Sequence, residues 1–312
     1  MFYNGEKEKA VFRLAMLVKE QRDTYTGELL DLRNDYVFKS FFGDKRNENL
    51  LLKFLNAVLD VDIHAIELTD PHIERNHSTD KKSIMDVRVQ TARGDQINIE
   101  MQMAGHRAFP ERMYMYMAKM YVSQDEAGKK YSDYKKAIQI IITNFTLLIE
   151  EDYHNVYKIT NQKSGSIFTN HYEAHILELP KLIKEDIKKT TELEKWLLFL
   201  KSDQQIKEAL AMESTTMKEA FEEIERLSQN PETRRFAAFR EQELKDILER
   251  EDEAMEKGVK KGMEQGMEQG VEQEKQEAVI RMYSDGMSVD NISKYASLSR
   301  DKVMEIIKLM EQ

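Results

Sequence analysis

Cysteine is absent from this 312-residue sequence, and proline and tryptophan are scarce, with four and one residues. The absence of cysteine excludes disulfide bonds and thiolate metal sites. It is typical of proteins in a reducing compartment, so the cytoplasm is the expected location. No stretch approaches the roughly 18 uninterrupted apolar residues of a membrane span, so a membrane is not an expected partner. The N-terminal segment, which has alternating Glu and Lys at positions 6–9, lacks the apolar core of a signal peptide.

Hydrophobic residues make up 41% of the chain and charged residues 33%, a mixture that suits a globular protein with a strongly solvated part. The net charge of -10 is unfavourable for binding a polyanion, but it is unevenly distributed. The first 145 residues carry 22 Lys and Arg against 22 Asp and Glu, whereas the remainder carries 25 against 35. The acidity belongs to the second half, so a nucleic-acid site in the first half is not excluded.

Hydrophobic periodicity predicts both helices and strands in the first 180 residues. Apolar residues recur at helical spacing in four segments, which predicts helices over 6–22, 35–42, 46–59 and 110–126. Alternating or continuously apolar segments predict strands over 83–90, 96–103, 137–145, 153–160 and 172–179. This order predicts an α/β core in which helices flank a sheet.

Changes in composition divide the chain into five expected segments. The first is a helical extension over 1–28, which is followed by the α/β domain over 29–180. The second half is expected to be all-α and comprises a helical extension over 181–250, a linker rich in Gly, Glu and Gln over 251–277, and a helix-turn-helix-like module over 278–312.

The expected linker contains a repeat in which glycine recurs every four residues, from Gly258 to Gly270, beside a stripe of Val and Met. Each interior glycine costs about 1 kcal/mol of helix stability relative to alanine. Two alternatives therefore remain open: a flexible linker, or a helix that packs closely against a partner helix. From Gly286 onward the charges balance, four against four, which is unfavourable for contacts with a DNA backbone. These features favour an assembly role and predict a homo-oligomer formed through the C-terminal helices.

The strands predicted over 83–90 and 96–103 carry a polar face opposite an apolar one. A three-residue loop ending in Gly94 sets a register in which Asp86 lies across from Glu100, with about 5 Å between their Cβ atoms. Two carboxylates at that distance repel each other unless a proton or a cation lies between them. One interpretation is a Mg²⁺ site formed by Asp86, Glu100 and the backbone carbonyl of Met101. The other is an ordinary solvated polar face.

An ordered series of motifs favours the first interpretation. Asn34 to Lys39, then Asp86, then Glu100-Met101-Gln102 resemble the Rpn family (recombination-promoting nuclease / putative transposase) of the PD-(D/E)XK phosphodiesterase superfamily. The likeness covers about residues 29–200 and includes several later positions: Arg112, Tyr116, Gly128, Tyr131 and Glu178-Leu179-Pro180-Lys181.

The resemblance implies an α-β-β-β-α-β core, with a mixed sheet flanked by helices and an all-α C-terminal extension. It also implies a DNA endonuclease that hydrolyses phosphodiester bonds with Mg²⁺ or Mn²⁺ as cofactor. Asp86 and Glu100 match the metal-binding acids. Gln102 stands where the superfamily often has lysine, and its neutral amide can orient the attacking water but cannot supply a positive charge.

Two further groups of residues are candidate members of this site. Asp35 and Lys39 lie one helical turn apart, as catalytic residues or as a simple intrahelical ion pair. Arg112, Tyr116 and Lys119 form one polar stripe, for DNA phosphate contacts or as a solvated helix face. A catalytically silent scaffold of the same fold, which binds DNA or protein partners in a mobile-element or phage-defence setting, is the alternative function.

Overall fold

The computed structural model describes residues 27–70, 72–73, 83–84, 86–105, 108–125, 127–184 and 186–310. The chain forms two compact units, and the boundary between them lies between Glu241 and Gln242. The helix expected over 6–22 and nearly all of the extension expected over 1–28 lie outside the described residues. Within the described residues, no helix combines the length and the apolar composition needed to cross a membrane.

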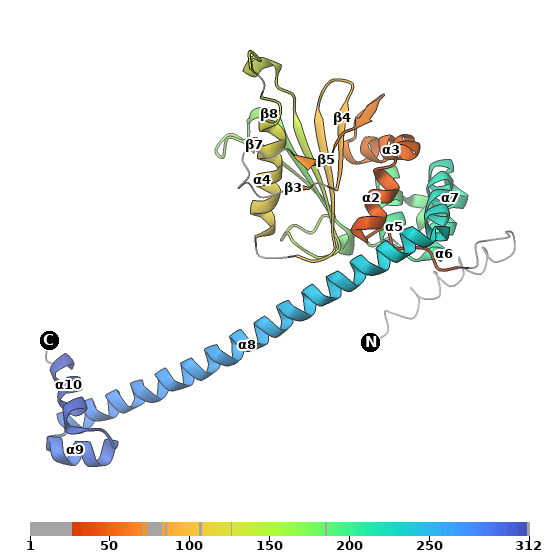
Figure 1. Ribbon diagram of the computed structural model, residues 1–312. Coiled ribbons are helices and arrows are strands. Elements are labelled where there is room, and N and C mark those ends of the chain that lie inside the picture. Colours follow the sequence, from red (N-terminus) through yellow and green to blue (C-terminus); the bar gives the residue numbers. More distant parts are fainter. Residues whose placement is uncertain are drawn as a thin grey trace. The chain divides into compact units, whose positions relative to one another are not determined.

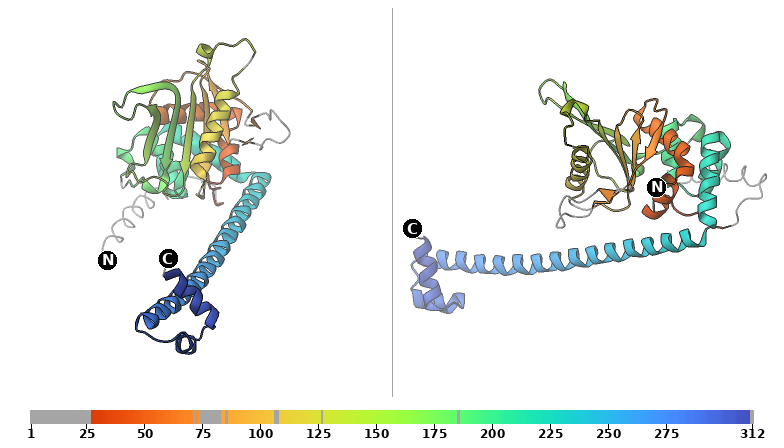
Figure 2. Two further views of the ribbon diagram at one scale, coloured as in Figure 1. Left: turned by 90° about the vertical axis from the view of Figure 1, so that its left-hand side faces the viewer. Right: turned by 45° about the horizontal axis from the view of Figure 1, so that its top comes forward.

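Six strands of the first unit form a mixed sheet in the order β1-β4-β5-β6-β8-β7 (Figure 1). Strands β5, β6 and β8 run parallel, whereas the pairs β1–β4, β4–β5 and β7–β8 are antiparallel. The strand bounds are β1 Ile66–Leu68, β4 Val87–Thr91, β5 Gln96–Gln102, β6 Ala137–Thr143, β7 His154–Thr160 and β8 Ile167–Glu178. In Figure 2, β7 and β8 extend as a hairpin beyond the neighbouring strands.

The strand expected over 83–90 is interrupted in the structure. Its beginning forms β3 (Ser83–Ile84), which pairs with β2 (His72–Ile73) in a separate two-stranded sheet. The backbone then bends at Asp86, and the strand of the main sheet begins at Val87. The prediction of one continuous strand was therefore wrong, because alternation of apolar residues carries no information about a backbone bend.

Helices cover both faces of the sheet. Helix α4 (Phe109–Val122) lies on one face, and the helices that flank α4 in the sequence lie on the other (Figure 1). Those helices are α2 Asp35–Phe42, α3 Glu48–Leu59, α5 Glu192–Lys201, α6 Gln204–Glu213 and α7 Thr215–Gln229. The observed order of elements confirms the α/β class and the α-β-β-β-α-β core.

The segment from residue 181 to Glu241 belongs to the same compact unit as the sheet. Trp196 and Phe221, on α5 and α7, are buried in one continuous cluster with Ile97 and Ile99 of β5. Glu178 lies at the junction, where it is fully buried and accepts hydrogen bonds from Lys181 and from two backbone N–H groups. A boundary at residue 180 therefore does not separate two compact units, because these helices cover the apolar face of the sheet.

Local sequence determines the position of α2, the helix that carries Lys39. Asn34 caps its N-terminus by accepting hydrogen bonds from the backbone N–H groups of Tyr36 and Val37. Phe38, with the neighbouring phenylalanines of the same helix, is fully buried. The helix ends at Gly43, where a Cβ atom would lie only 2.6 Å from the carbonyl oxygen of Lys39. These constraints place the side of α2 that carries Lys39 beside the open end of the β4–β5 hairpin, where Asp86 lies.

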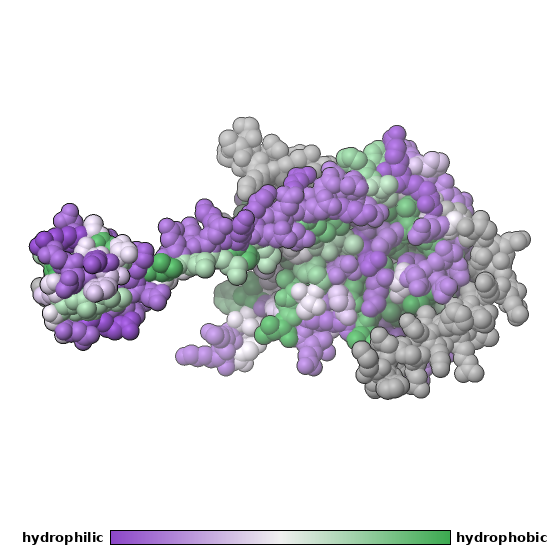
Figure 3. Space-filling view, turned by 90° about the horizontal axis from the view of Figure 1, so that it is seen from below, coloured by the Kyte–Doolittle hydropathy of each residue, from purple (hydrophilic) through white to green (hydrophobic). Residues whose placement is uncertain are grey.

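The second unit contains most of helix α8 (Pro231–Ser284) followed by α9 (Val289–Ala296) and α10 (Arg300–Met310). Val279, at the end of α8, packs with Ile292 and Val303 in a small separate core. The segment expected as a linker over 251–277 is helical and exposed throughout. Figure 3 shows hydrophilic residues along one side of this helix and hydrophobic ones along another.

Candidate metal centre

The β4–β5 hairpin has the register that the sequence predicts. Val87 pairs with Ile99 and Arg88 with Asn98, and Gly94 in the turn has a φ of 90°. Asp86 directly precedes Val87 and lies at the bend before β4. The polar face that carries Glu100 lies under helix α4 and is buried, so that Glu100 is only 2% exposed.

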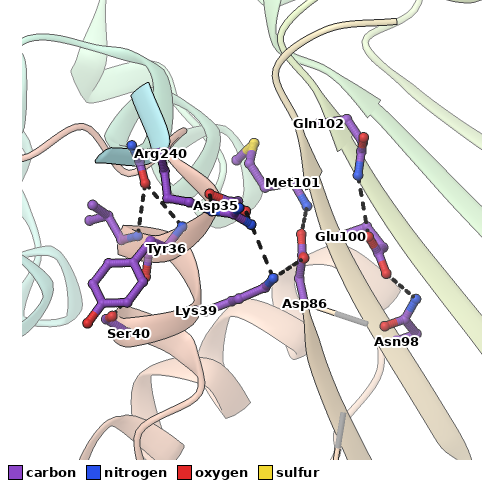
Figure 4. Close-up of polar contacts among 12 residues, drawn as sticks. Asp35, Tyr36, Lys39, Ser40, Asp86, Asn98, Glu100, Met101, Gln102 and Arg240 are labelled. Carbon is purple, nitrogen blue, oxygen red and sulfur yellow. Dashed lines mark hydrogen bonds and ion pairs between the residues drawn. The ribbon is translucent and has the colours of Figure 1, made fainter. Parts of the chain in front are cut away.

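Glu100 accepts hydrogen bonds from two neutral amides on its own strand. Asn98 Nδ2 lies 3.1 Å from Oε1, and Gln102 Nε2 lies 3.4 Å from Oε2 (Figure 4). Burial and the neighbouring negative charge of Asp86 together raise the pKa of Glu100 to about 8. Glu100 therefore holds a proton near neutral pH when no cation is bound.

Asp86 lies between a backbone amide and an ammonium group. Its Oδ2 accepts the N–H of Met101 at 2.9 Å, and its Oδ1 lies 3.0 Å from Lys39 Nζ. Burial raises the pKa of Asp86, although the charge of Lys39 and the Met101 hydrogen bond oppose this effect. This contact places the backbone N–H of Met101 beside Asp86, and the carbonyl of the same residue is the predicted metal ligand.

Arg112 fixes the orientation of Gln102. Its Nη2 donates a hydrogen bond of 2.7 Å to Gln102 Oε1, and its guanidinium lies over the ring of Phe109. A guanidinium can only donate, so the amide oxygen of Gln102 must face Arg112 and the amide NH₂ must face Glu100. Through Gln102, Arg112 is connected to the acidic centre, which is formed by Asp86 and Glu100. This connection favours a site residue over the alternative of an ordinary solvated helix face.

The remaining predicted residues lie around this centre. Tyr116 is half-buried, and its pKa is raised first by burial and then by the negative charge of Glu100. Lys119 follows Arg112 on α4 at about 10 Å along the helix axis. Asp35 lies one turn from Lys39, but its carboxylate is bound by Arg240, with Nη2 and Oδ2 separated by 2.6 Å. The acidic pair, Gln102, Lys39, Arg112 and Tyr116 are thus brought together.

The donor atoms at this centre fit a hard divalent cation. The pair supplies carboxylate oxygens, and the amide oxygen of Asn98 beside it is buried without a hydrogen-bond partner. Mg²⁺ is held in proteins by one or two carboxylates and keeps several waters, so two acids suffice. Within the described part of the chain, no group of three or more His, Cys, Asp and Glu side chains is arranged to hold a metal ion, so this centre depends on two carboxylates.

Two residues of the centre were not assigned from the sequence. Asn98 lies on the predicted polar face two residues before Glu100, so the same alternation could have identified it. Arg240 lies 205 residues from Asp35, and no motif or periodicity connects the two positions.

The α-β-β-β-α-β core and the paired acids on its central hairpin define a protein of the PD-(D/E)XK class. The model of the family described as "PD-(D/E)XK nuclease family transposase" matches residues 32–287, and the chain belongs to this family. The match confirms the resemblance noted in the sequence. No curated protein and no solved structure matches the chain.

Proposed function

We propose that this protein is a DNA endonuclease that hydrolyses phosphodiester bonds with Mg²⁺ or Mn²⁺ held by Asp86, Glu100 and the backbone carbonyl of Met101. One observation carries the proposal: a buried carboxylate pair in which Glu100 accepts hydrogen bonds from two neutral amides, while burial and the charge of Asp86 raise its pKa to about 8. Such a pair favours the binding of a cation. A divalent cation at this position would polarise the scissile phosphodiester and activate a bound water.

The surrounding residues take complementary roles in the proposed reaction. Gln102, held by Arg112, orients the attacking water through its amide. The amide at position 102 carries no positive charge. Lys39, whose ammonium group lies 3.0 Å from Asp86, supplies that charge. Cations aimed at developing negative charge lower the reaction barrier.

Helix α4 is the proposed contact surface for the DNA backbone. Tyr116 and Lys119 continue along α4 from Arg112, so they can contact phosphates next to the one that is cleaved. Asp35, bound by Arg240, acts through Lys39 rather than on the substrate.

Plasmid cleavage tests this function and separates the enzyme from a silent scaffold. Supercoiled plasmid incubated with the protein should be nicked or linearised when Mg²⁺ or Mn²⁺ is present and should stay intact in chelator. A scaffold would shift the mobility of the plasmid without cutting it under any metal condition. Binding without cleavage would therefore replace the endonuclease with the scaffold.

Association through α8 is a second proposal, and exposed apolar residues favour it. Met255, Met263 and Met267 are at least 70% exposed, and the glycines beside them have open space where a Cβ would stand. A partner helix of a second copy would cover this stripe. Light scattering should give a smaller mass for the chain truncated after Arg250 and for Met263→Glu. An unchanged mass in both variants would exclude association through this helix.

A further inference from the structure

Arg240 forms a bidentate ion pair with Asp35 at the N-terminus of α2. Its Nη2 lies 2.6 Å from Oδ2 and its Nε 3.2 Å from Oδ1, so one guanidinium occupies both oxygens of the carboxylate. Paired hydrogen bonds of this kind are stronger and more directional than a single contact between charges. Asp35 is therefore already neutralised by a residue of α8 (Figure 4).

Lys39 has two carboxylates within reach. Its Nζ lies 3.0 Å from Asp86 Oδ1 and 4.0 Å from Asp35 Oδ2. An Asp and a Lys four residues apart on one helix attract each other, so Asp35 competes with Asp86 for the ammonium group. In the structure the pairing with Asp86 is the shorter one.

We propose that Arg240 is a positioning residue: by occupying both oxygens of Asp35, it leaves the Lys39 ammonium group on Asp86, where the proposed reaction needs it. This inference rests on the proposed endonuclease function. In this account Asp35 is a competitor, because its negative charge without Arg240 would draw Lys39 away from Asp86.

Other contacts hold α8 on α2, so the ion pair is not their only connection. Asn34 Nδ2 donates a 2.9 Å hydrogen bond to the carbonyl oxygen of Ala237, and the rings of Tyr36 and Phe236 lie 5.2 Å apart. Removing the charge of Arg240 therefore leaves these two anchors in place. An effect of Arg240 on Lys39 can be separated from a general loss of packing.

Cleavage kinetics of full-length variants test the inference. Arg240→Gln should lower kcat about tenfold with little change in KM for DNA, and Arg240→Lys should recover part of the rate. The double variant Arg240→Gln with Asp35→Asn should be more active than Arg240→Gln, and equal to Asp35→Asn alone, because the competitor for Lys39 is gone. Lys53→Gln, which breaks the 2.7 Å pair with Glu219 elsewhere in the same unit, is the matched control and should keep the rate.

Two outcomes would overturn the inference. If the double variant is no more active than Arg240→Gln, the ion pair serves only to hold the helices together. If Asp35→Asn is the least active variant, Asp35 acts directly in the reaction.

A measurement without DNA separates failure of this inference from failure of the proposed function. The NMR signal of the Lys39 ammonium group, assigned with Lys39→Arg, should shift in Arg240→Gln and return toward its wild-type position in the double variant. An unchanged signal in Arg240→Gln overturns the positioning role even if the protein cleaves DNA. A shift in a protein that does not cleave leaves the pairing intact and rejects the endonuclease.

Discussion

Glu100 and Glu173 are buried carboxylates two strands apart in the same sheet. The polar groups around them differ in charge. Glu100 on β5 is 2% exposed and Glu173 on β8 is 8% exposed. The amides of Asn98 and Gln102 face Glu100, whereas Lys136, Lys158 and His175 surround Glu173 on the opposite face.

The two environments shift the two pKa values in opposite directions. Burial and the charge of Asp86 raise the pKa of Glu100 to about 8. Burial also opposes ionisation of Glu173, but hydrogen bonds from Lys136 and His175 lower the pKa of Glu173 below its usual value. Burial alone therefore does not mark a functional acid. The stronger indication of a functional acid is a buried carboxyl group that lies next to a second acid and has no ion-pair partner, because such a group needs a cation in order to ionise.

The largest expected effect distinguishes the two glutamates in catalysis. Asp86→Asn and Glu100→Gln should each lower plasmid cleavage about a thousandfold or more, since charge stabilisation by a metal is worth several kcal/mol. Glu173→Gln should cleave at nearly the wild-type rate under the same conditions, although Lys136 and Lys158 lose an ion-pair partner. Gel assays with Mg²⁺ give both rates. Full activity of Glu100→Gln, or loss of cleavage in folded Glu173→Gln, would break the comparison.

A smaller effect is expected from the amide beside Glu100. Gln102→Ala should reduce the cleavage rate about a hundredfold, or about 2.7 kcal/mol, without a matching loss of Mg²⁺ affinity. Gln90→Ala, at the other end of the same hairpin face, is the control. Cleavage rate measured against Mg²⁺ concentration separates turnover from affinity, and a wild-type curve for Gln102→Ala would remove Gln102 from the reaction.

Lysine at position 102 should not restore activity. Because Arg112 lies 2.7 Å from the amide oxygen of Gln102, Gln102→Lys would place two cations against each other. We expect this variant to cleave no faster than Gln102→Ala. A faster rate would mean that Arg112 moves away and that Lys39 does not supply the positive charge.

A separate effect is expected on stability. Glu100 gains its proton near pH 4.5 in the unfolded chain and near pH 8 in the folded protein, so the folded state binds more protons between these values. The free energy of unfolding should fall as pH rises through that window, at about 1.4 kcal/mol per unit for one proton. Glu173 acts with the opposite sign, since its ion pairs stabilise the folded state above its unfolded pKa and are lost only at lower pH.

Urea unfolding at pH 5 and pH 8 in chelator checks both signs. At pH 8, Glu100→Gln should be more stable than the wild type, because no buried charge must form, and Glu173→Gln should be less stable. Equal shifts in the two variants would show that the two sites share one electrostatic character.

The sequence was sufficient for the parts of the fold that depend on local periodicity. Helices α2 and α3 and the β4–β5 register followed from apolar spacing and from the turn at Gly94, and the register placed Asp86 next to Glu100. Asn98 was on the same predicted face, so the alternation located its side chain, and the structure adds its hydrogen bond to Glu100.

Other features depend on contacts between distant parts of the chain. The pairing of Arg240 with Asp35 and the burial of α5–α7 against the sheet arise from tertiary packing, which no local pattern encodes. The bend at Asp86 was missed for a related reason, because Ser83 and Ile84 pair with β2 rather than with β5. The contact between Arg112 and Gln102 also joins a helix to a strand. It holds the amide of Gln102 in one orientation at the position where the superfamily often has lysine.

Proton release on cation binding is the most direct test of the acidic centre. Calorimetric titration of the protein with Mg²⁺ or Mn²⁺ at pH 7, in two buffers with different heats of protonation, measures both affinity and released protons. The account predicts binding with release of about one proton, and no such release in Glu100→Gln. Absence of binding, or binding with the same proton release in Glu100→Gln, would contradict the assignment of Asp86 and Glu100 as the metal centre.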